Sequence, residues 1–502
     1  MTDGGLYARI WARIEPAAGR PFLTIPDGRR WTFGEIDALA ARFAGALANA
    51  GAKPGDRIAV QVEKSAENVA LYLASLRGGF VYLPLNTAYT DAELAYFIKD
   101  AEAAIFVCDP ARREAAPAGP KVLTLSATGD GSLMAAAGDA APFGVEARAA
   151  DDLAAILYTS GTTGRSKGAM LTHANLASNA EALLSIWGFR ADDVLLHTLP
   201  IFHIHGLFVA LNTSLLNASE VIFMPKFDVA EVRRRLPRAT IMMGVPTFYT
   251  RLLAEKDFGP ADCRNIRVFI SGSAPLTIET FDAFKARTGH EILERYGMSE
   301  AGMIASNPLA GERVAGTVGY ALPSVEIRVT ADGRALSSGE TGVVEIRGPN
   351  VFKGYWRMPE RTAEAFMDGG WFSTGDVGFL SEDGRLTLSG REKDLIIVGG
   401  LNVYPREIEE SLDALQGVAE SAVIGVPHPD MGEGVLAVLV PAGGPAAAPP
   451  LTDGELQSAM SALARFKQPR KFVWMDELPR NAMGKVQKQA LRDRFADAFA
   501  SK

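Results

Sequence analysis

Residues 158–168 are Tyr158-Thr159-Ser160-Gly161-Thr162-Thr163-Gly164-Arg165-Ser166-Lys167-Gly168, a stretch rich in hydroxyl groups and glycine. It directly follows an apolar run over residues 153–157, which predicts a β-strand. Backbone N–H groups in conformations that glycine permits form a cradle for an anion, and Lys167 adds a positive charge. The spacing is not that of a P-loop nucleotide hydrolase. On composition alone, an ordinary surface loop is an equally good interpretation.

The chain on both sides of this stretch alternates between strand-like and helix-like patterns. Helical patterns occupy residues 66–76 and 91–99. Short apolar runs that predict strands occupy residues 58–60, 80–83, 104–107, 241–245 and 268–271. This alternation predicts an α/β fold with mainly parallel sheets covered by helices. Ligands in such folds bind at the carboxyl ends of the strands.

The pattern of expected strands and helices changes along the chain, and it predicts a large N-terminal domain over residues 1–392 and a small, mobile α+β C-terminal domain over residues 393–502. Short alternating strands with Asp-Gly and Ser-Gly turns over about 325–390 indicate a β-rich subdomain within the first. Residues 110–150 are rich in Ala, Gly and Pro, and we expect an irregular connection with one helical turn at most. A chain of 502 residues is too long for one ordinary core, which agrees with two domains.

Composition argues against several classes of protein. Hydrophobic residues make up 48% and charged residues 22% of the chain, as in globular proteins. No run approaches the roughly 18 apolar residues of a membrane span, and neither a secretory signal nor a transit peptide is visible, so we expect a cytoplasmic protein that binds no membrane. The net charge of −8 argues against a nucleic-acid surface. Cys108 and Cys263 are expected to be buried thiols, and no zinc motif is present.

A second glycine–lysine motif lies near the other end of the chain, in Pro479-Arg480-Asn481-Ala482-Met483-Gly484-Lys485. A lysine that follows a glycine near a flexible end can swing onto a phosphate and away again. Together with residues 158–168, this motif indicates activation of a carboxylate by ATP in a protein whose two domains move. Lys488 is the alternative to Lys485 as the operative lysine.

Five ordered motifs resemble the adenylate-forming superfamily, which includes acyl-CoA synthetases, firefly luciferase and the adenylation domains of peptide synthetases. The resemblance covers nearly the whole chain. The motifs are Tyr158–Gly164 with Lys167-Gly168, Tyr296-Gly297-Met298-Ser299-Glu300, Trp371-Phe372-Ser373-Thr374-Gly375-Asp376, Gly390-Arg391 and Gly484-Lys485.

The resemblance implies a site for ATP. Residues 160–167 would hold the β- and γ-phosphates, Tyr296 would flank the adenine, and Asp376 would accept both ribose hydroxyls with support from Arg391. The full set implied for ATP is Thr159, Ser160, Gly161, Thr162, Thr163, Gly164, Lys167, Gly272, Ser273, Ala274, Tyr296, Gly297, Met298, Asp376 and Arg391.

The resemblance also implies three catalytic residues, Lys485, Glu300 and Ser299. Glu300, with Thr162, would hold Mg²⁺, and Ser299 would contact the α-phosphate. Most relatives carry Thr at the position of Ser299, and serine keeps the hydroxyl. A carboxylate that approaches a polyphosphate meets a repulsion of about 4 kcal/mol per pair of unit charges about 4 Å apart at an effective dielectric of about 20. Mg²⁺ and Lys485 would offset that repulsion while pyrophosphate leaves.

For the second half-reaction the resemblance implies a rotation of the C-terminal domain about Lys393. The rotation would present Gly399 and Gly400 to a tunnel for the pantetheine arm of CoA, since paired glycines admit a narrow chain. A simple Gly-Gly turn is compatible with the same residues. CoA is thus expected as the co-substrate, and no obligate protein partner is evident.

Two arginines point to the acid that is activated. Arg251 and Arg295 flank segments from which this family builds its acyl pocket, and a buried guanidinium needs an anion. A second carboxylate on the substrate would supply it, and the short spacing in malonate suits a pocket shortened by His205 and Met303. The residues expected to bind the acid are His205, Arg251, Ser273, Arg295 and Met303. This pattern looks like the malonyl-CoA synthetases, which also take methylmalonate.

Three other functions stay open from the sequence. The nearest is an acyl-CoA synthetase for another short or aromatic monocarboxylate, without a charged partner in its pocket. The second is a stand-alone adenylation enzyme that loads a carrier protein in place of CoA. The third is a non-catalytic nucleotide-binding regulator, which the intact Lys485, Glu300 and Asp376 disfavour.

Overall fold

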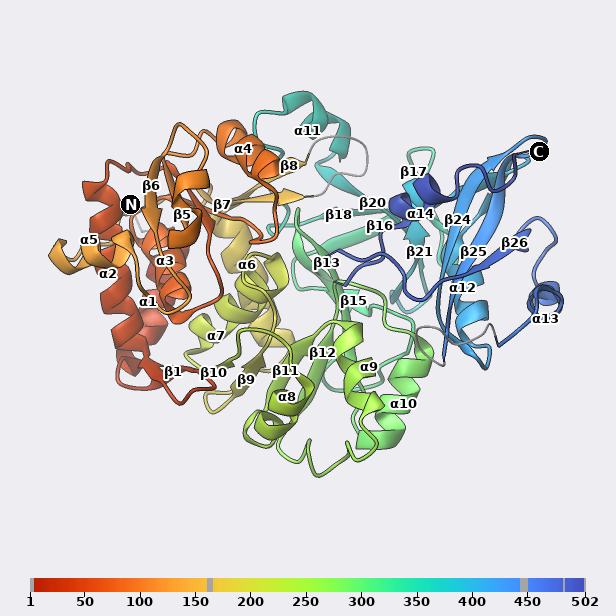
Figure 1. Ribbon diagram of the computed structural model, residues 1–502, viewed down its shortest axis with the longest axis horizontal. Helices are drawn as coiled ribbons and strands as arrows, with labels where there is room; N and C mark the ends of the chain where they lie inside the picture. The colour runs from red at the N-terminus through yellow and green to blue at the C-terminus, as the bar shows by residue number, and fades with distance from the viewer. Residues whose placement is uncertain (1–3, 160–165, 443–449, 482–483, 501–502) are drawn as a thin grey trace.

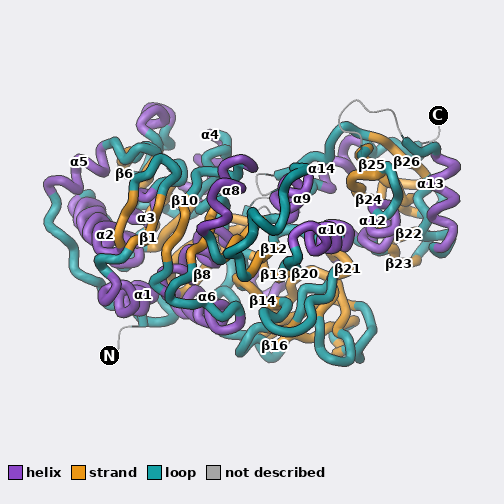
Figure 2. The backbone as a smooth tube through the Cα atoms, turned by 90° about the horizontal axis from the view of Figure 1, so that it is seen from below, coloured by secondary structure: helices purple, strands orange, loops and turns teal. Residues whose placement is uncertain are grey.

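The computed structural model describes residues 4–159, 166–442, 450–481 and 484–500. The chain runs from two helix-covered sheets in its N-terminal part, through an antiparallel sheet, to a separate C-terminal unit at the far end of the molecule (Figure 1). The view from below shows the same order, with the N-terminus and the C-terminal sheet at opposite ends (Figure 2). The predicted α/β fold is therefore confirmed.

The first sheet contains six strands and is mostly parallel. Only its last pair is antiparallel, and the connection of that pair carries the hydroxyl- and glycine-rich stretch. In spatial order its strands are β6 (Lys121–Thr124), β5 (Ile105–Cys108), β3 (Arg57–Gln61), β4 (Val81–Pro84), β7 (Leu153–Thr159) and β8 (Lys167–Thr172).

The second sheet contains nine strands. The six that run from β13 to β1 are parallel to their neighbours, whereas β14, β15 and β2 are antiparallel additions at the two edges. In spatial order the strands are β15 (Tyr320–Ala321), β14 (Gly302–Ser306), β13 (Leu293–Met298), β12 (Val268–Ser271), β11 (Ile241–Gly244), β9 (Val194–His197), β10 (Glu220–Phe223), β1 (Pro21–Thr24) and β2 (Arg30–Thr32).

One hydrophobic core joins these two sheets, with helices packed between and around them. Of the residues in α3, all but Arg77 are buried, so the helix is enclosed on all sides and its polar residues Glu67, Asn68 and Ser75 are buried together with its apolar ones. Thr172 caps α6 by accepting a hydrogen bond from the backbone N–H of Asn175. The helices of this region are α1 (Leu6–Ile14), α2 (Phe33–Asn49), α3 (Ala66–Arg77), α4 (Asp91–Asp100), α5 (Ser132–Asp139), α6 (His173–Ile186), α7 (Asn212–Asn217), α8 (Val229–Arg235), α9 (Pro246–Ala254) and α10 (Ile278–Thr288), with a π-helix over His205–Leu211.

Residues 110–150 are more regular than the sequence suggests. They contain strand β6, helix α5 and a 3₁₀ turn over Pro110–Ala115. Leu123 and Leu133 are buried in the main core, so a few apolar side chains are enough to fix an Ala- and Gly-rich segment. The other 3₁₀ turns cover Glu15–Ala17, Leu236–Arg238, Glu392–Asp394 and Met460–Ala462.

An antiparallel sheet follows in the part of the chain for which the sequence predicts a β-rich subdomain. Its strands are β17 (Arg334–Ala335), β16 (Glu326–Ala331), β18 (Gly342–Arg347), β20 (Trp371–Leu380) and β19 (Phe366–Met367), with β21 (Leu386–Arg391) paired to β20 and α11 (Pro359–Ala365) before β19. The pairing of β20 with β21 sets Asp376 opposite Arg391.

The C-terminal unit has its own sheet and its own two hydrophobic clusters. Its strands are β23 (Leu401–Val403), β22 (Ile396–Val398), β25 (Gly432–Pro441) and β24 (Val418–His428), with β26 (Lys471–Trp474) paired to β25, and its helices are α12 (Pro405–Asp413), α13 (Asp453–Ala459) and α14 (Lys488–Arg494).

Both cysteines of the chain, Cys108 and Cys263, are buried free thiols, as expected. Among the described residues, no helix is long and apolar enough to cross a bilayer.

Arg406 on α12 joins the C-terminal unit to the rest of the chain. Its guanidinium donates one hydrogen bond to the carbonyl oxygen of Leu388 on β21, at 2.7 Å, and a longer one to the carbonyl of Gly316, at 3.4 Å. The side chain is largely buried there. Arg406 thus contributes to the orientation of the C-terminal unit.

We expect Arg406→Ala to loosen this orientation. A hydrogen bond from a charged donor contributes about 1.5–3 kcal/mol, so its loss should raise the open population about tenfold. Cleavage by endoproteinase Lys-C after Lys393, which is exposed in the connecting turn, should accelerate to a similar degree. Arg361→Ala, which removes an exposed ion pair with Glu364, is the control and should leave the rate unchanged. Equal rates in wild type and Arg406→Ala would show that other contacts set the orientation.

Candidate active site

The carboxyl ends of four parallel strands, β9, β11, β12 and β13, form one edge of the nine-stranded sheet. The segment after β12 passes close to β13. A Cβ atom on Gly272 would lie 2.4 Å from Cζ of Arg295, so only glycine fits beside that guanidinium. The next residue, Ser273, has φ of +72°, a left-handed conformation that is uncommon for serine. Backbone strain of this kind is typical of functional segments.

Glu294 fixes the far end of this segment. Its carboxylate accepts a hydrogen bond from the backbone N–H of Leu276 at 3.0 Å. The side chain is buried, and burial raises its pKa to about 7. Glu294 therefore anchors residues 272–276 while its neighbour on the strand, Arg295, points to the other face of the sheet.

Arg295 is the most unusual charge in this region. The residue is only 3% exposed, and neither Nε nor Nη2 has a hydrogen-bond partner among the described residues. Burial lowers the pKa of the guanidinium to about 9. A buried charge without a partner is expensive, so this side chain is arranged for an anion that binds from outside the chain.

Two histidines lie near this guanidinium. Nδ1 of His205 is 3.1 Å from Oγ of Ser273, and Nε2 of His205 is buried without a partner among the described residues. Burial, followed by the charges of Arg295 and Lys485, lowers the pKa of His203 to about 4. Burial and Arg295 also hold the pKa of His205 well below its usual value. Both imidazoles are therefore neutral near pH 7, and the free nitrogen of His205 can contact the same anion as Arg295.

Asp376 forms the opposite wall of the site. Its carboxylate accepts a hydrogen bond from the hydroxyl of Tyr296 and pairs with Nε of Arg391 at 3.1 Å. Its backbone N–H donates to Oγ1 of Thr374 at 3.0 Å. Asp376, Tyr296 and Arg391, which the sequence assigns to the nucleotide, are thus brought together by the pairing of β20 with β21 and its contact with β13.

Glu300 lies beside the hydroxyl- and glycine-rich stretch. Its carboxylate accepts a hydrogen bond from the hydroxyl of Tyr355 at 3.2 Å, and Nζ of Lys167 lies 4.4 Å from the centre of the Tyr355 ring. Burial raises the pKa of Glu300, because the charged form has lost its water. A buried carboxylate in this position suits a cation that arrives together with a polyphosphate.

Lys485 reaches the site from the C-terminal unit. Its backbone N–H donates to Oδ1 of Asn481 at 3.0 Å, and Gly484 lies beside Thr247 at the start of α9. Burial, followed by repulsion from Arg391, lowers the pKa of the ammonium to about 8, and attraction to Asp376 opposes the shift. Because Lys485 also acts on the pKa of His203, its charge lies between the nucleotide wall and the histidines.

Lys488, the alternative to Lys485, has a different partner. Its ammonium pairs with Glu409 of α12 at 2.6 Å. This pair holds α14 against α12 within the C-terminal unit. The geometry thus favours Lys485 as the lysine that faces the site.

The two arginines predicted for the acid differ in burial. Arg251 lies in the last turn of α9 with its side chain exposed, so it is not the enclosed guanidinium. The helix begins at Pro246, and the phase of its turns buries Tyr249 and Leu252 instead. Of the two arginines, only Arg295 is enclosed, and contact between Arg251 and the acid stays a prediction.

The remaining residues predicted for the site lie as follows. Met303 is buried on β14 and packs against Gly297, whereas Met298, Ser299 and Ala274 are half-buried near the strand ends. Thr159 and Lys167 face each other across the β7–β8 pair. Ser160, Gly161, Thr162, Thr163 and Gly164 lie outside the described residues.

The residues predicted for CoA and the hinge are exposed in this orientation. Gly399 and Gly400 form the turn between β22 and β23, with φ of +57° and +83°. Their position after Lys393 agrees with a segment that changes its surroundings when the C-terminal unit moves. A tunnel for pantetheine stays a prediction.

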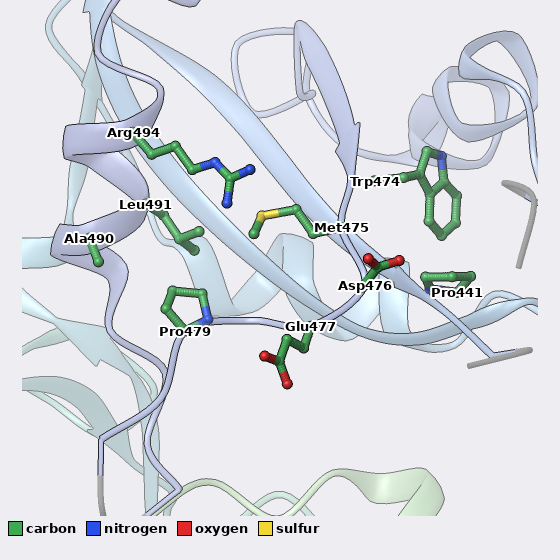
Figure 3. A pocket seen from close by; sticks show the side chains of 9 residues that line it. All are labelled: Pro441, Trp474, Met475, Asp476, Glu477, Pro479, Ala490, Leu491 and Arg494. Atoms are coloured by element: carbon green, nitrogen blue, oxygen red, sulfur yellow. The ribbon is translucent and has the colours of Figure 1, made fainter. Parts of the chain in front are cut away.

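A hollow of about 720 Å³ lies elsewhere, within the C-terminal unit (Figure 3). In the close-up, Arg494 from α14 points toward Met475, which follows β26. No residue predicted for the site lines this hollow, and the lining consists of Pro441, Trp474, Met475, Asp476, Glu477, Pro479, Ala490, Leu491 and Arg494. The hollow is large, but its position and its lining separate it from the site at the strand ends.

Sequence reasoning missed two residues near the site. Tyr355 contacts Glu300 and Lys167, but a tyrosine in a Lys-Gly-Tyr-Trp segment gives no chemical signal. Lys64 contacts His197 at the end of β9. It lies three residues after the end of β3, and its acceptors are more than a hundred residues away, so no local pattern in the sequence marks it.

Two family models match the chain. One, described as AMP-binding enzyme, matches residues 10–356, and one described as AMP-binding enzyme C-terminal domain matches residues 407–485. A malonate–CoA ligase from Arabidopsis thaliana is 34% identical and covers 93% of this chain and 85% of its own length. A feruloyl-CoA synthase from an Amycolatopsis species is 35% identical and covers 93% and 94%.

The chain is also similar to two solved structures of one protein, one with ATP bound and one without ligand. ATP-bound MatB from Rhodopseudomonas palustris is 50% identical, covers 99% of this chain and 100% of its own, and superposes with a TM-score of 0.96. Apo MatB from the same organism is 51% identical over the same shares and superposes with a TM-score of 0.85. The arrangement of this chain is thus closer to the ATP-bound form.

The enclosed charge leads to a prediction on stability. Arg295→Met should raise the free energy of unfolding of the ligand-free protein by roughly 1–3 kcal/mol, because it replaces an unpaired buried guanidinium by an apolar side chain of similar length. Urea denaturation without ligands measures this change. Arg251→Met, at an exposed position, is the control and should stay within about 0.5 kcal/mol of wild type. A loss of stability in Arg295→Met would show that the guanidinium is already satisfied.

Proposed function

Because the chain belongs to the AMP-binding enzyme family, we propose that it is an AMP-forming acid–thiol ligase that converts malonate, ATP and CoA to malonyl-CoA, AMP and pyrophosphate. The observation that carries the choice of acid is the enclosed guanidinium of Arg295, whose Nε and Nη2 have no partner among the described residues. The similarity to a malonate–CoA ligase supports the same choice.

In the first half-reaction a carboxylate oxygen of malonate attacks the α-phosphorus of ATP. A P–O bond to the acid forms, the bond between the α-phosphorus and the bridging oxygen breaks, and pyrophosphate leaves. Arg295 and the free nitrogen of His205 hold the second carboxylate, which fixes the direction of the first. Asp376 accepts the ribose hydroxyls, and Lys485 places its ammonium against the charge that builds up.

Mg²⁺ would supply a Lewis acid for the phosphate oxygens, with Glu300 as its ligand. No group of three acidic, histidine or cysteine side chains able to hold a metal occurs within the described part of the chain. Mg²⁺ is commonly held by one or two carboxylates together with substrate phosphates, and the buried carboxylate of Glu300 is of the kind that such a site uses. Thr162, the second expected ligand, lies outside the described residues.

In the second half-reaction the sulfur of CoA attacks the acyl carbon of malonyl-AMP. A C–S bond forms, the C–O bond to the phosphate of AMP breaks, and the thiol proton passes to solvent. We propose that the C-terminal unit rotates about Lys393 between the two steps. The rotation withdraws Lys485 and brings Gly399 and Gly400 to the path of the pantetheine arm.

The choice of acid is tested by measuring the rate of pyrophosphate release with malonate, methylmalonate, acetate and 4-coumarate as substrates. Malonate should be favoured over acetate by about 10²–10³ in kcat/KM, because an unpaired buried charge costs about 3–5 kcal/mol. Arg295→Met should lose most of this preference and keep its KM for ATP. The similarity to a feruloyl-CoA synthase makes an aromatic acid the alternative, and turnover of 4-coumarate equal to that of malonate would establish it.

The first half-reaction should depend on the charge of Lys485. Its pKa lies at about 8 in the free protein, so kcat/KM for pyrophosphate formation should fall as the pH rises through about 8 and the ammonium is lost. Bound ATP favours the charged form and should move the same limb of kcat to higher pH. Lys485→Ala should abolish the limb and lower adenylation by at least about 10², while thioester formation from supplied malonyl-AMP largely survives.

Lys488→Ala is the matched control for this experiment. It breaks a pair within the C-terminal unit and should change adenylation by less than about threefold, because a partly exposed ion pair contributes little. Equal losses of both half-reactions in Lys485→Ala would instead make Lys485 a structural residue.

A further inference from the structure

Lys64 links the two N-terminal sheets at the edge where the site lies. It follows β3 of the first sheet and directly precedes Ser65, which caps α3. Its ammonium contacts three acceptors at the end of β9 and just beyond it: Nδ1 of His197 at 2.7 Å, the carbonyl of His197 at 3.0 Å and the carbonyl of Leu199 at 2.9 Å. It also lies 4.4 Å from the centre of the Phe223 ring.

These contacts fix the charge of Lys64. Burial lowers the pKa of its amine well below the usual value. The carbonyl oxygen of Gly206 can only accept from Nε2 of His197, so Nδ1 of the neutral imidazole is an acceptor. Three acceptors then require three N–H groups, which only the ammonium form of Lys64 has, and the face of Phe223 also attracts a cation. No carboxylate among the described residues pairs with this ammonium. The geometry therefore favours the charged form, with backbone carbonyls and an imidazole as its partners.

The same contacts fix the tautomer of His197. An ammonium has no acceptor, so Nδ1 of His197 must accept its hydrogen bond. Nε2 consequently carries the proton and donates to the carbonyl of Gly206 at 2.8 Å. His197 is 1% exposed, and burial together with Lys64 holds its pKa well below the usual range. The imidazole thus stays neutral: it accepts a hydrogen bond from Lys64 at Nδ1 and donates one to the carbonyl of Gly206 from Nε2.

Gly206 holds the loop that carries the histidines of the acid site. A Cβ atom on Gly206 would lie 2.1 Å from the carbonyl oxygen of Pro200, so the loop is folded tightly on itself. Gly206 follows His205 at the start of the π-helix, a type of helix that occurs mostly at functional sites. The position of the imidazole of His205, 3.1 Å from Ser273, therefore depends on where the carbonyl of Gly206 is held.

We propose that Lys64 and His197 act as positioning residues for the acid subsite, and the proposal rests on the proposed function. Lys64 itself contacts neither the acid nor the nucleotide. It holds the loop over residues 197–206 through His197 and Gly206, and the loop holds His205 beside Arg295. Loss of this relay should affect the binding of the acid more than the binding of ATP.

Lys64→Met tests the relay, because methionine keeps an unbranched stem and removes all three donors. Displacement of a binding group by about 1 Å can cost up to about 10², so kcat/KM for malonate should fall about 10- to 100-fold, mainly through KM. KM for ATP should change less than about twofold. Lys53→Met, at an exposed position in the same lobe, is the matched control and should match wild type. An unchanged KM for malonate in Lys64→Met would overturn the proposal.

A double-mutant cycle separates the relay from general destabilisation. His197→Phe keeps a ring and removes both nitrogens. If the two residues act as one unit, Lys64→Met combined with His197→Phe should lose no more than the worse single variant. Additive losses, or equal rises in KM for malonate and ATP, would mean that both residues only stabilise the fold. If Lys64→Met does not fold, Lys64→Gln, which keeps two donors, carries the same test.

Failure of the proposed function and failure of the relay give different results. Wild type is assayed first, and an absence of malonate-dependent pyrophosphate release would reject the proposed acid before any variant is measured. Activity of wild type with unchanged KM values in the Lys64 and His197 variants would reject the relay alone.

Discussion

The enclosed guanidinium of Arg295 is the constraint on which the rest of the site depends. It lies on β13, which is parallel to β12 on one side and antiparallel to β14 on the other, and the side chain is almost completely buried. The segment after β12 can pass it only because Gly272 has no side chain. Burial of this unpaired charge costs free energy, and on the proposed function a dianionic acid that binds beside it offsets that cost. Selectivity for the second carboxylate is then a consequence of burial, and requires no additional recognition element.

Positive charge dominates the remainder of the site, and each part of it comes from a different element. Lys167 comes from the first sheet, Arg391 from the antiparallel sheet and Lys485 from the C-terminal unit. Asp376 and Glu300 oppose these cations, Asp394 adds a weaker attraction to Arg391 and Lys485, and burial raises the pKa of Glu300. The imbalance suits a polyanionic nucleotide, whose phosphates complete the neutralisation that the chain leaves unfinished.

The sequence predicted the parallel sheets, the order of the motifs and the residues that meet around Asp376, because strand patterns and motif spacing are local properties. It failed where the answer depends on packing. Burial of a helical side chain depends on packing in the same way: the phase of α9 after Pro246 turns Tyr249 inward and leaves Arg251 exposed, and contact between Arg251 and the acid stays a prediction. Strand β6 and helix α5 were not expected, since their order comes from buried leucines that contact distant elements. Lys64 was missed because its three acceptors, on His197 and Leu199, lie more than a hundred residues away.

The orientation of the C-terminal unit follows from the same balance of charge. Lys485 lies half-buried beside Arg391, and their repulsion is offset only in part by Asp376. On the proposed function, ATP supplies the missing negative charge, so this orientation is favoured while the phosphates are present. Departure of pyrophosphate removes that charge and leaves two cations close together in a poorly hydrated place. The contacts that oppose rotation are modest, since Arg406 donates to backbone carbonyls that water can replace. Loss of pyrophosphate therefore favours the withdrawal of Lys485. On the proposed function, the thiol of CoA requires this withdrawal before it can reach the acyl-adenylate.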